Sequence, residues 1–410
     1  MNVQTVISTD LITPLGAYLR LRDGGRGSFL LESVERGRLG RYSFVGSGSR
    51  LVYLNEAEAL GEPVVGYLGY DHAATLEPTV QLPDQGPDLP ESRFLVAETL
   101  IRFDHVLGLA EVLCGNPDEL AAQLAAPVAE PKSEARGNGG SPRRFPGRFE
   151  YERRVEKAKK HIRAGDAFQI VLSQRAERPT SASAVDLYRS LRRVNPSPYL
   201  FLLELDELAL VGSSPETLVK ADNGIAELNP IAGTTHPGEG DAERLLASEK
   251  DRAEHVMLVD LGRNDLSRVC RPGTVRVQRF LEPERYSHVT HLVSEVTGEL
   301  NGGVSHFDLL RACFPAGTVS GAPKVRAMQI ISELEGHRRG PYAGAVGYFL
   351  PDGAVDTCIA IRTIVLHDGV AYLQAGAGIV ADSSPSAEHD ECLRKLAALE
   401  RAIELAEARS

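Results

Sequence analysis

The sequence contains no tryptophan, only five cysteines and no long apolar run. The cysteines are scattered without a CxxC pair, which argues against a disulfide framework and favours reduced thiols. No apolar stretch approaches the roughly 20 residues that a membrane-spanning helix needs. The N-terminal residues lack the basic and apolar segments of a signal peptide. We therefore expect a cytoplasmic protein that has no membrane partner.

Basic residues are also fewer than acidic ones. Lysine and arginine number 45 against 56 aspartate and glutamate residues, so the formal net charge is −11. Such a field disfavours nonspecific binding of nucleic acid, and we expect no nucleic-acid partner. No GxGxxG pattern and no phosphate-binding P-loop is present. An anionic ligand must therefore be held by local donors or by a cation.

The 410 residues divide into three parts by composition. Residues 1–126 alternate short strand-like runs with a few helical ones. Residues 127–148 are rich in proline, glycine and charge, and we predict a flexible linker there. Residues 149–410 carry the clearest patterns, in which hairpins are mixed with single helices. That mixture favours an α+β fold built on antiparallel sheets over a doubly wound parallel sheet.

Glycine and hydroxyl residues gather in three segments of the C-terminal part, residues 228–238, 317–327 and 374–384. We predict a turn in each, because exposed backbone N–H groups in glycine turns bind carboxylates and phosphates. Gly376 and Gly378 would leave room for a ligand beside the backbone. The periodicity also predicts one helix over residues 242–261 and another that ends at Gly336.

Two pairs of acidic residues have helical spacing. Asp251 and Glu254 share one helix face, and Glu388 and Glu391 repeat the spacing on another helix. Together they could bind one Mg²⁺, which prefers one or two direct carboxylates. Acidic residues in the first turn of a helix also complement its dipole, so an ordinary surface role stays open. Apolar residues follow Glu254 almost at once, which indicates that this part of its helix is buried.

Two further polar residues interrupt apolar strands. Arg362 either points to solvent or binds a carboxylate inside the protein. His291 is either a packed, hydrogen-bonded histidine or a catalytic one. Three anion-binding turns, a strand arginine and a possible Mg²⁺ site indicate a small substrate with more than one carboxylate.

Nine motifs cover nearly all of residues 149–400: GDAFQIVLSQR, NPSPYLF, GSSPETL, NPIAGT, AEHVMLVDLGRNDLSRV, GTVSGAPKVRAM, PYAGAVGYF, CIAIRT and QAGAGIVADSSPSAEHDE. In this order they resemble the chorismate-utilising enzymes, and in detail the large subunits of anthranilate synthase. The N-terminal strings DLITPLGAYLRL and FLLESVERGRLGRYSFVG resemble the same subunits more weakly. The resemblance implies a four-layer α/β/β/α core with two orthogonally packed antiparallel sheets, and it implies Mg²⁺.

The same resemblance assigns roles to individual residues. Glu254 and Glu391 match the metal ligands, with Asp251 and Glu388 as their partners through water. The chorismate contacts are matched by Gly233, Thr234, Tyr342, Arg362, Gly376, Ala377 and Gly378. Arg362 is implied to bind the carboxylate of the enolpyruvyl arm, while the ring carboxylate sits on Mg²⁺.

Three matched residues carry the chemistry: His291, Thr318 and Glu216. Thr318 is implied to place its hydroxyl near the ring. Glu216 matches the acid that protonates the departing ring hydroxyl, so burial must keep it neutral near pH 7. We hypothesise that His291 assists the later elimination of pyruvate.

The position of Ala232 is a lysine in relatives that form aminodeoxychorismate, and that of Gln169 is a lysine in relatives that add water to chorismate. This chain has neither lysine, which leaves external ammonia as the nucleophile. The resemblance therefore favours a lyase that aminates chorismate and eliminates pyruvate to give anthranilate, a step of tryptophan biosynthesis. Two alternatives stay open: an aminodeoxychorismate synthase large subunit, and a catalytically silent subunit that senses tryptophan.

The chain has no GxCxG-type glutaminase nucleophile. The resemblance thus implies a hetero-oligomer in which a glutamine amidotransferase subunit supplies the ammonia. It also implies a feedback site for tryptophan, formed with the N-terminal part by Glu32, Ser33, Pro198, Tyr199 and Leu200.

The chain departs from the family pattern at four positions and in its short N-terminal part. Thr235 and His236 replace an expected basic pattern, Leu200 stands where methionine is common, and Asp251 replaces a glutamate. These departures bear on feedback and on partner docking more than on the chemistry.

Overall fold

A computed structural model describes residues 6–23, 25–33, 40–128, 139–206, 208–235, 237–285 and 290–408. Within these ranges the strands form two large sheets in which every pair of neighbours is antiparallel. The predicted α+β class with antiparallel sheets is therefore confirmed.

The first sheet has twelve strands and includes both the first and the last strand of the described chain. In sheet order they are β1 (Val6–Ser8), β8 (Leu109–Cys114), β7 (Thr99–Asp104), β3 (Tyr42–Gly48), β2 (Gly27–Glu32), β11 (Tyr199–Leu205), β12 (Leu208–Ser214), β21 (Thr363–His367), β22 (Val370–Ile379), β10 (Gln169–Pro179) and β18 (Gly321–Ala322), with β9 (Arg143–Phe145) also on β10.

The second sheet has ten strands and carries the middle of the chain. In sheet order they are β15 (Ile231–Thr235), β17 (Thr290–Glu299), β14 (Ile225–Leu228), β13 (Thr217–Asp222), β20 (Val355–Ile359), β19 (Ala345–Phe349), β5 (Val64–Leu68), β6 (Ser92–Val96) and β4 (Arg50–Val52), with β16 (Arg276–Arg285) also on β17.

The helices of the described residues cover the outer faces of the sheets. They are α1 (Pro14–Leu21), α2 (Leu54–Leu60), the 3-10 helix η1 (Tyr70–His72), α3 (Ala73–Leu76), α4 (Pro117–Ala125), α5 (Arg148–Arg163), α6 (Ala184–Val194), α7 (Asp241–Ala247), α8 (Glu249–Ser267), α9 (His306–Cys313), α10 (Gly317–Ser320), α11 (Lys324–Glu335) and α12 (Pro385–Glu407). As predicted, α11 ends at Gly336, whose φ of 62° is in the left-handed region that favours glycine.

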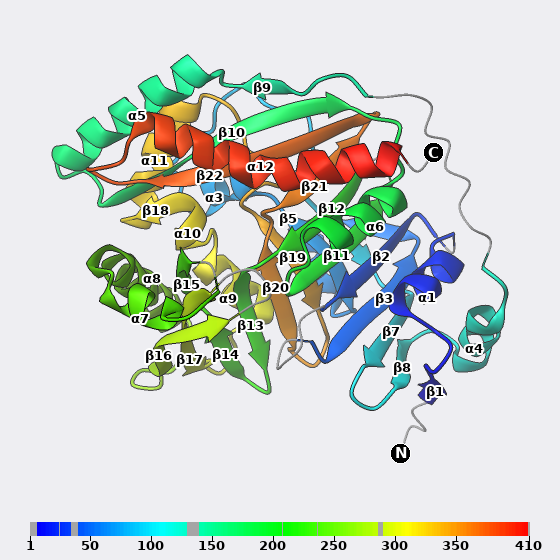
Figure 1. The fold of residues 1–410 in the computed structure, drawn as a ribbon. Helices are drawn as coiled ribbons and strands as arrows, with labels where there is room; N and C mark the ends of the chain where they lie inside the picture. The colour runs from blue at the N-terminus through cyan, green and yellow to red at the C-terminus, as the bar shows by residue number, and fades with distance from the viewer. Residues whose placement is uncertain are drawn as a thin grey trace.

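Three stacked apolar cores give the order of the layers. The first lies between α1, α6 and α12 and the first sheet, and it includes Tyr188 and Leu396. The second lies between the sheets, with Phe29 and Phe201 from one and Tyr67 from the other. The third lies between the second sheet and helices such as α2 and α9. In Figure 1, β10 and β22 run across the view while β13 and β20 run down it, so these strands cross. The predicted α/β/β/α order is confirmed.

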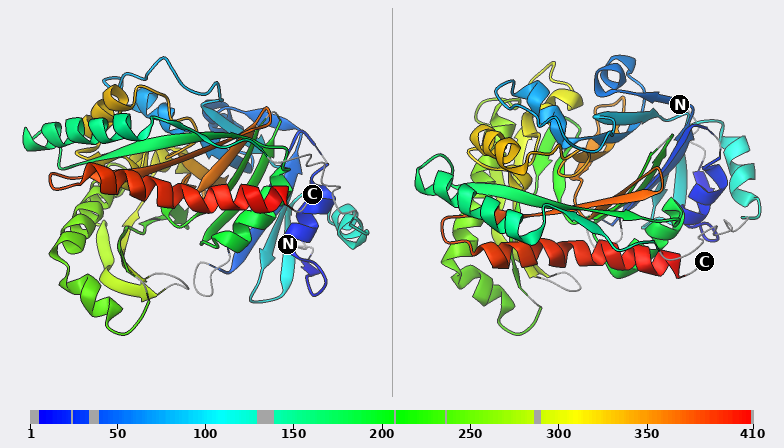
Figure 2. Two further views of the ribbon diagram at one scale, coloured as in Figure 1. Left: turned by 45° about the horizontal axis from the view of Figure 1, so that its top comes forward. Right: turned by 90° about the horizontal axis from the view of Figure 1, so that it is seen from above.

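The N-terminal and C-terminal parts share both sheets. In the first sheet β2 pairs with β11, and in the second β5 pairs with β19. Both views in Figure 2 show the blue N-terminal strands continuing the green and orange ones. Within the predicted linker, residues 129–138 lie outside the described residues, whereas β9 pairs with β10. The division at residues 1–126, 127–148 and 149–410 therefore stays a prediction about function.

The structure corrects three local predictions. The helix predicted over residues 242–261 is two helices, α7 and α8, separated at Ser248, which caps α8. The turn predicted within residues 228–238 is strand β15, which bulges at Gly233, where φ is 68°. Gly376 and Gly378 lie inside strand β22 and not in a turn. In the last two cases pairing with a neighbouring strand overrides the local preference of glycine for turns.

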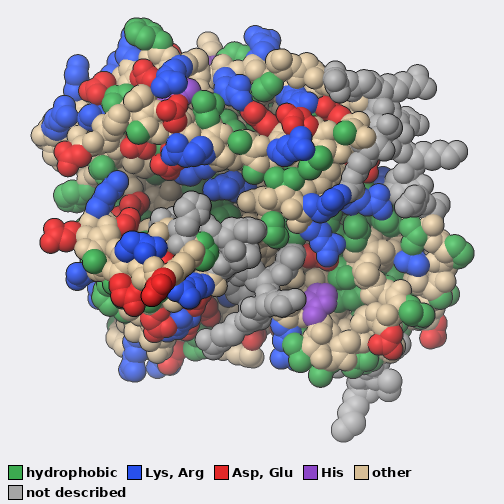
Figure 3. Space-filling view, viewed as in Figure 1, with side chains coloured by type: hydrophobic (Ala, Val, Ile, Leu, Met, Phe, Trp, Pro, Cys, Tyr) green, Lys and Arg blue, Asp and Glu red, His purple; other side chains and the backbone are tan. Residues whose placement is uncertain are grey.

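None of the described helices combines the length and the apolar character that crossing a membrane requires. Figure 3 shows basic and acidic side chains intermixed over one face, without a continuous basic area.

Candidate active site

A cavity of about 420 Å³ opens where the two sheets meet helices α8 and α12. Eight of the residues predicted from the sequence line it: Glu216, Glu254, His291, Thr318, Arg362, Gly376, Gly378 and Glu391. They come from positions up to 175 residues apart in the sequence, so only the tertiary fold brings them together.

The two carboxylates matched to metal ligands face this cavity from different helices. Glu254, on α8, accepts a hydrogen bond from Gln169 Nε2 at 3.1 Å. Glu391, on α12, forms an ion pair with Lys395 at 2.8 Å. Both side chains are half-buried. The other two predicted acids stand behind them and are not part of the cavity wall. Glu388 is close enough to Glu391 for their charges to interact, and burial raises its pKa.

Asp251 lies against the backbone of the β15 bulge. Its Cβ is 3.2 Å from the place that a Cβ on Gly233 would take. Within the described residues no three His, Cys, Asp or Glu side chains converge in the manner of a protein-only metal site. Mg²⁺ needs no such cluster, since one or two carboxylates suffice when water and substrate oxygens complete its shell. Glu254 and Glu391 fit that requirement.

Arg362 supplies the cationic side of the cavity. It has a φ of 52°, which is rare for a residue with a side chain and clusters at functional sites. Among the described residues its guanidinium forms no ion pair and no hydrogen bond with a side chain, and burial lowers its pKa. Of the two alternatives left open by the sequence, the side chain takes the interior one. It is available to bind an anion that enters the cavity.

His291 is oriented by the bulge in β15. Its Nδ1 lies 2.8 Å from the carbonyl oxygen of Gly233. Because a carbonyl can only accept, the proton of the neutral ring is on Nδ1. Burial is the main cause of a lowered pKa for His291, and the charge of Arg362 acts in the same direction. The histidine is thus held neutral, with Nε2 as the basic nitrogen.

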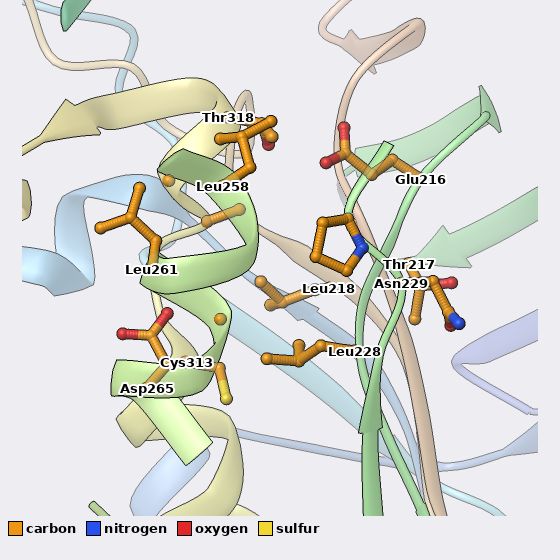
Figure 4. Close-up of a pocket in the computed structure, with 14 residues that line it drawn as sticks. Glu216, Thr217, Leu218, Leu228, Asn229, Leu258, Leu261, Asp265, Cys313 and Thr318 are labelled. Carbon is orange, nitrogen blue, oxygen red and sulfur yellow. The ribbon is translucent and has the colours of Figure 1, made fainter. Parts of the chain in front are cut away.

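Glu216 is the most perturbed acid of the cavity. Burial raises its pKa to about 7, opposed by the Thr318 hydroxyl and the Lys395 ammonium. The Thr318 hydroxyl oxygen is itself buried, and none of the described groups forms a hydrogen bond of good geometry with it. Figure 4 shows Glu216 at the edge of a chamber of about 50 Å³ that Leu228, Leu258 and Leu261 also line. A carboxyl in such surroundings favours its neutral form.

The remaining predicted contacts form the frame of the cavity. The Tyr342 hydroxyl lies against Gly376, where a Cβ would come within 2.8 Å of it. Ala377 is buried between Gly376 and Gly378 and pairs with Leu172. Thr234 pairs through its backbone with His291, and its side chain lies outside what the structure describes, as does His236.

Sequence reasoning missed Lys395. It lines the cavity, pairs with Glu391 and donates a hydrogen bond to the Gly376 carbonyl at 2.7 Å. Its position four residues after Glu391 on one helix was a usable signal, because such residues share a face. Ala232 and Gln169, which bear on the chemistry because neither position is a lysine, also line the wall of the cavity.

A second cavity of about 200 Å³ lies between the sheets, beside the first. All five residues predicted for the feedback site line it: Glu32, Ser33, Pro198, Tyr199 and Leu200. Glu32 is buried, accepts a hydrogen bond from Tyr188 and pairs with Arg192 at 3.3 Å. The Ser33 hydroxyl oxygen is buried without a partner among the described residues. Pro198 lines both cavities.

Known proteins resemble this chain over most of its length. A family description of chorismate binding enzymes matches residues 36–401. Anthranilate synthase component 1 of Thermus thermophilus is 43% identical over 97% of this chain and 97% of its own length. The probable anthranilate synthase component 1 of Schizosaccharomyces pombe is 42% identical over 97% and 92%, respectively. The solved structure of anthranilate synthase component I from Streptococcus pneumoniae matches with a TM-score of 0.82 at 33% identity, covering 97% of this chain and 100% of that one.

The chain therefore belongs to the chorismate binding enzyme family. Within that family, the relatives compared above are first components of anthranilate synthase.

Proposed function

We propose that this protein is the large subunit of anthranilate synthase, a lyase that converts chorismate and ammonia into anthranilate and pyruvate. One observation carries the proposal. A single cavity holds the cation Arg362, the carboxylates Glu254 and Glu391 and the acid Glu216, while Ala232 and Gln169 stand where lysines would direct other chemistry. The similarity to first components of anthranilate synthase supports it.

Chorismate is a dianion and needs two binding points in a protein of negative net charge. Arg362 binds the carboxylate of the enolpyruvyl arm, since a guanidinium matches a carboxylate with two parallel hydrogen bonds. Glu254 and Glu391 would hold Mg²⁺, with Asp251 and Glu388 behind them. The metal, when bound, neutralises the ring carboxylate. The small residues Gly376 and Gly378 let the ring approach β22 closely.

Amination requires an acid. Ammonia forms a bond to ring carbon 2 as the bond from carbon 4 to its hydroxyl breaks, and Glu216 donates the proton with which that hydroxyl leaves as water. A pKa of about 7 keeps a substantial fraction of Glu216 protonated at neutral pH. Thr318 places its unpartnered hydroxyl beside the same acid.

Elimination requires a base. Neutral His291 presents Nε2 because Nδ1–H is bonded to the Gly233 carbonyl. It accepts the proton that ring carbon 2 loses as the bond to the enolpyruvyl oxygen breaks. Pyruvate leaves and the ring becomes aromatic.

Ammonia is supplied by a glutamine amidotransferase subunit, because this chain lacks the glutaminase nucleophile.

Tryptophan, the end product of the pathway, binds in the second cavity. The buried Ser33 hydroxyl and the Glu32 carboxylate supply polar contacts there, and Leu200 supplies an apolar one. We assign the feedback site to residues 1–126 together with the segment around Pro198, and catalysis to residues 149–410.

The first test is direct. The purified chain is incubated with chorismate, Mg²⁺ and an ammonium salt at mildly alkaline pH, where free ammonia is available. Fluorescent anthranilate and an equal amount of pyruvate are expected, and the reaction should stop when EDTA removes the metal.

Two other outcomes would count against the proposal. A product that retains the enolpyruvyl group would indicate aminodeoxychorismate synthase. Binding of tryptophan without consumption of chorismate would indicate a silent sensing subunit.

A further inference from the structure

A buried ion pair beneath the cavity takes no part in the mechanism above. Glu335 is the last residue of α11 and Arg339 lies four residues later, in the loop beyond Gly336, and they are only 4% and 3% exposed. Two hydrogen bonds join them, from Nε at 2.9 Å and from Nη2 at 2.7 Å. A buried pair of this kind is seldom retained for stability alone, because removing two charges from water costs about as much as their attraction returns.

The contacts of Arg339 lead to one residue that lines the cavity and to two that lie beside its lining residues. Its Nη1 donates to the carbonyl of Val319, the neighbour of Thr318, at 2.8 Å. Its Nη2 donates at 2.8 Å to the carbonyl of Val171, which lines the cavity from β10. Its guanidinium also lies 5.6 Å from the ring centre of Tyr342. Four of its five donor hydrogens are thereby used on groups that belong to different elements.

Glu335 extends the connection to the β22 wall. Its Oε1 accepts hydrogen bonds from the backbone N–H and the hydroxyl of Ser173, at 2.7 and 2.8 Å. Gln374 donates to that hydroxyl at 2.8 Å, two residues before Gly376 on β22. The ion pair is thus bonded, directly or through one residue, to β10, β22 and the α10 turn.

We propose that Arg339 and Glu335 are positioning residues, which fix the places of Thr318, Tyr342 and the β10–β22 wall relative to one another around the substrate. The inference rests on the proposed function, since Thr318 and Tyr342 matter only if the cavity binds chorismate. Neither Arg339 nor Glu335 lines that cavity. Their effect on the reaction is exerted through the residues that they hold.

The test compares two buried arginine–glutamate pairs that both involve strand β10. Arg339→Lys keeps the charge but loses the planar fork that reaches three partners at once. Arg178→Lys is the matched control, because Arg178 pairs with buried Glu407 at 2.7 Å and lies seven residues beyond Val171 on β10, about 23 Å away. Both variants lose a buried arginine, and only one borders the active site.

We expect kcat/KM for chorismate to fall at least about tenfold more in Arg339→Lys than in Arg178→Lys, when the two have similar losses in Tm. A double-mutant cycle adds a readout that a purely structural role would not move. Tyr342→Phe should cost less in the Arg339→Lys background than in the wild type, because Tyr342 is already displaced. In the Arg178→Lys background it should cost as much as in the wild type.

Equal losses of kcat/KM in the two lysine variants, or an additive cycle, would overturn the inference. Should Arg339→Lys fail to fold, Glu335→Asp provides the same comparison, since it keeps the charge and shortens the acceptor by one methylene. A wild-type protein that forms no anthranilate would overturn the proposed function, and this inference with it. If the wild type is active but the two lysine variants lose kcat/KM equally, or the cycle is additive, this inference alone is overturned.

Discussion

At the scale of single residues, the surroundings of an acidic side chain decide its pKa in this protein more than its residue type does. Glu216 faces a leucine-lined chamber, and its pKa rises to about 7. Asp241, at the start of α7, has almost no exposed surface, but it accepts hydrogen bonds from Arg285 and Thr290, which lower its pKa. The first acid is held ready to donate a proton, whereas the second is a permanent anion that fixes β16 and β17 to α7.

Replacing the acid should remove the proton donor without emptying the site. Glu216→Gln is expected to lower kcat by about 100-fold or more, with a small change in KM, because general acid catalysis contributes about that much. Steady-state kinetics with chorismate and ammonium measure it. A variant with wild-type kcat would exclude Glu216 as the acid.

The pH dependence of the wild type follows from the raised pKa. With free ammonia held constant by adjusting the ammonium salt, kcat/KM for chorismate should fall as pH rises above about 7, because the acid form of Glu216 disappears. That fall should be absent from the residual activity of Glu216→Gln. A flat wild-type profile between pH 6.5 and about 9 would contradict the assignment.

The stability of the folded chain should also depend on pH through Glu216. The pKa of Glu216 is higher in the folded chain than its ordinary value of 4.5, so folding favours the protonated form. This contribution is complete below the ordinary pKa and is lost as pH rises through about 7. The Tm of Glu216→Gln relative to wild type should therefore increase between pH 5 and pH 8.

At the scale of elements, the break between α7 and α8 sets the position of Glu254, one of the two carboxylates that we propose as metal ligands. The Ser248 hydroxyl accepts a hydrogen bond from the backbone N–H of Asp251 at 3.2 Å and caps the start of α8 six residues before Glu254. The apolar pattern over residues 242–261 continues through the break, and for that reason the sequence predicted a single helix. The serine followed three residues later by an acid was the local signal for a new N-terminus.

Removing the cap should affect both stability and the metal. Ser248→Ala is expected to cost about 1 kcal/mol in urea denaturation and to raise the Mg²⁺ concentration that gives half-maximal activity. Ser183→Ala is the matched control, because Ser183 caps α6 through the N–H of Asp186 at 3.1 Å, and α6 carries none of the four acids proposed for the metal site. An equal Mg²⁺ requirement in the two variants would contradict a role for this cap in metal binding.

At the scale of the whole molecule, two cavities share one segment of chain. Pro198 lines both, and β2 from the N-terminal part completes the wall of the second. A ligand in the second cavity therefore touches the segment that bounds the substrate. This arrangement would give the feedback proposed above a direct route, and it requires both parts of the chain in one sheet.

The feedback assignment is tested at Glu32. Glu32→Ala should raise the tryptophan concentration that gives half-maximal inhibition by at least about tenfold, since a lost hydrogen bond to a charged group is worth that much. Glu204→Ala is the matched control, because Glu204 accepts a hydrogen bond from buried Tyr18 on the same face of the same sheet and lies outside the cavity. Similar shifts in both variants would contradict the assignment.

The sequence by itself determined the family, the α+β class and many of the residues that line the cavity, because these depend on residue types in local motifs. Helices with clear caps, such as α11, were predictable for the same reason. The turns expected around Gly233 and Gly376 were not, since pairing with distant strands decided their conformation.

Only the tertiary structure decided which residues face one another. The hydrogen bond from Lys395 to the Gly376 carbonyl, the enclosure of Glu216 and the hydrogen bonds from Arg339 to Val319 and Val171 all depend on contacts between elements far apart in the chain. Burial and electrostatic coupling are properties of such neighbourhoods. No local pattern encodes them, and they turn a set of family residues into a site that can bind an anion and move a proton.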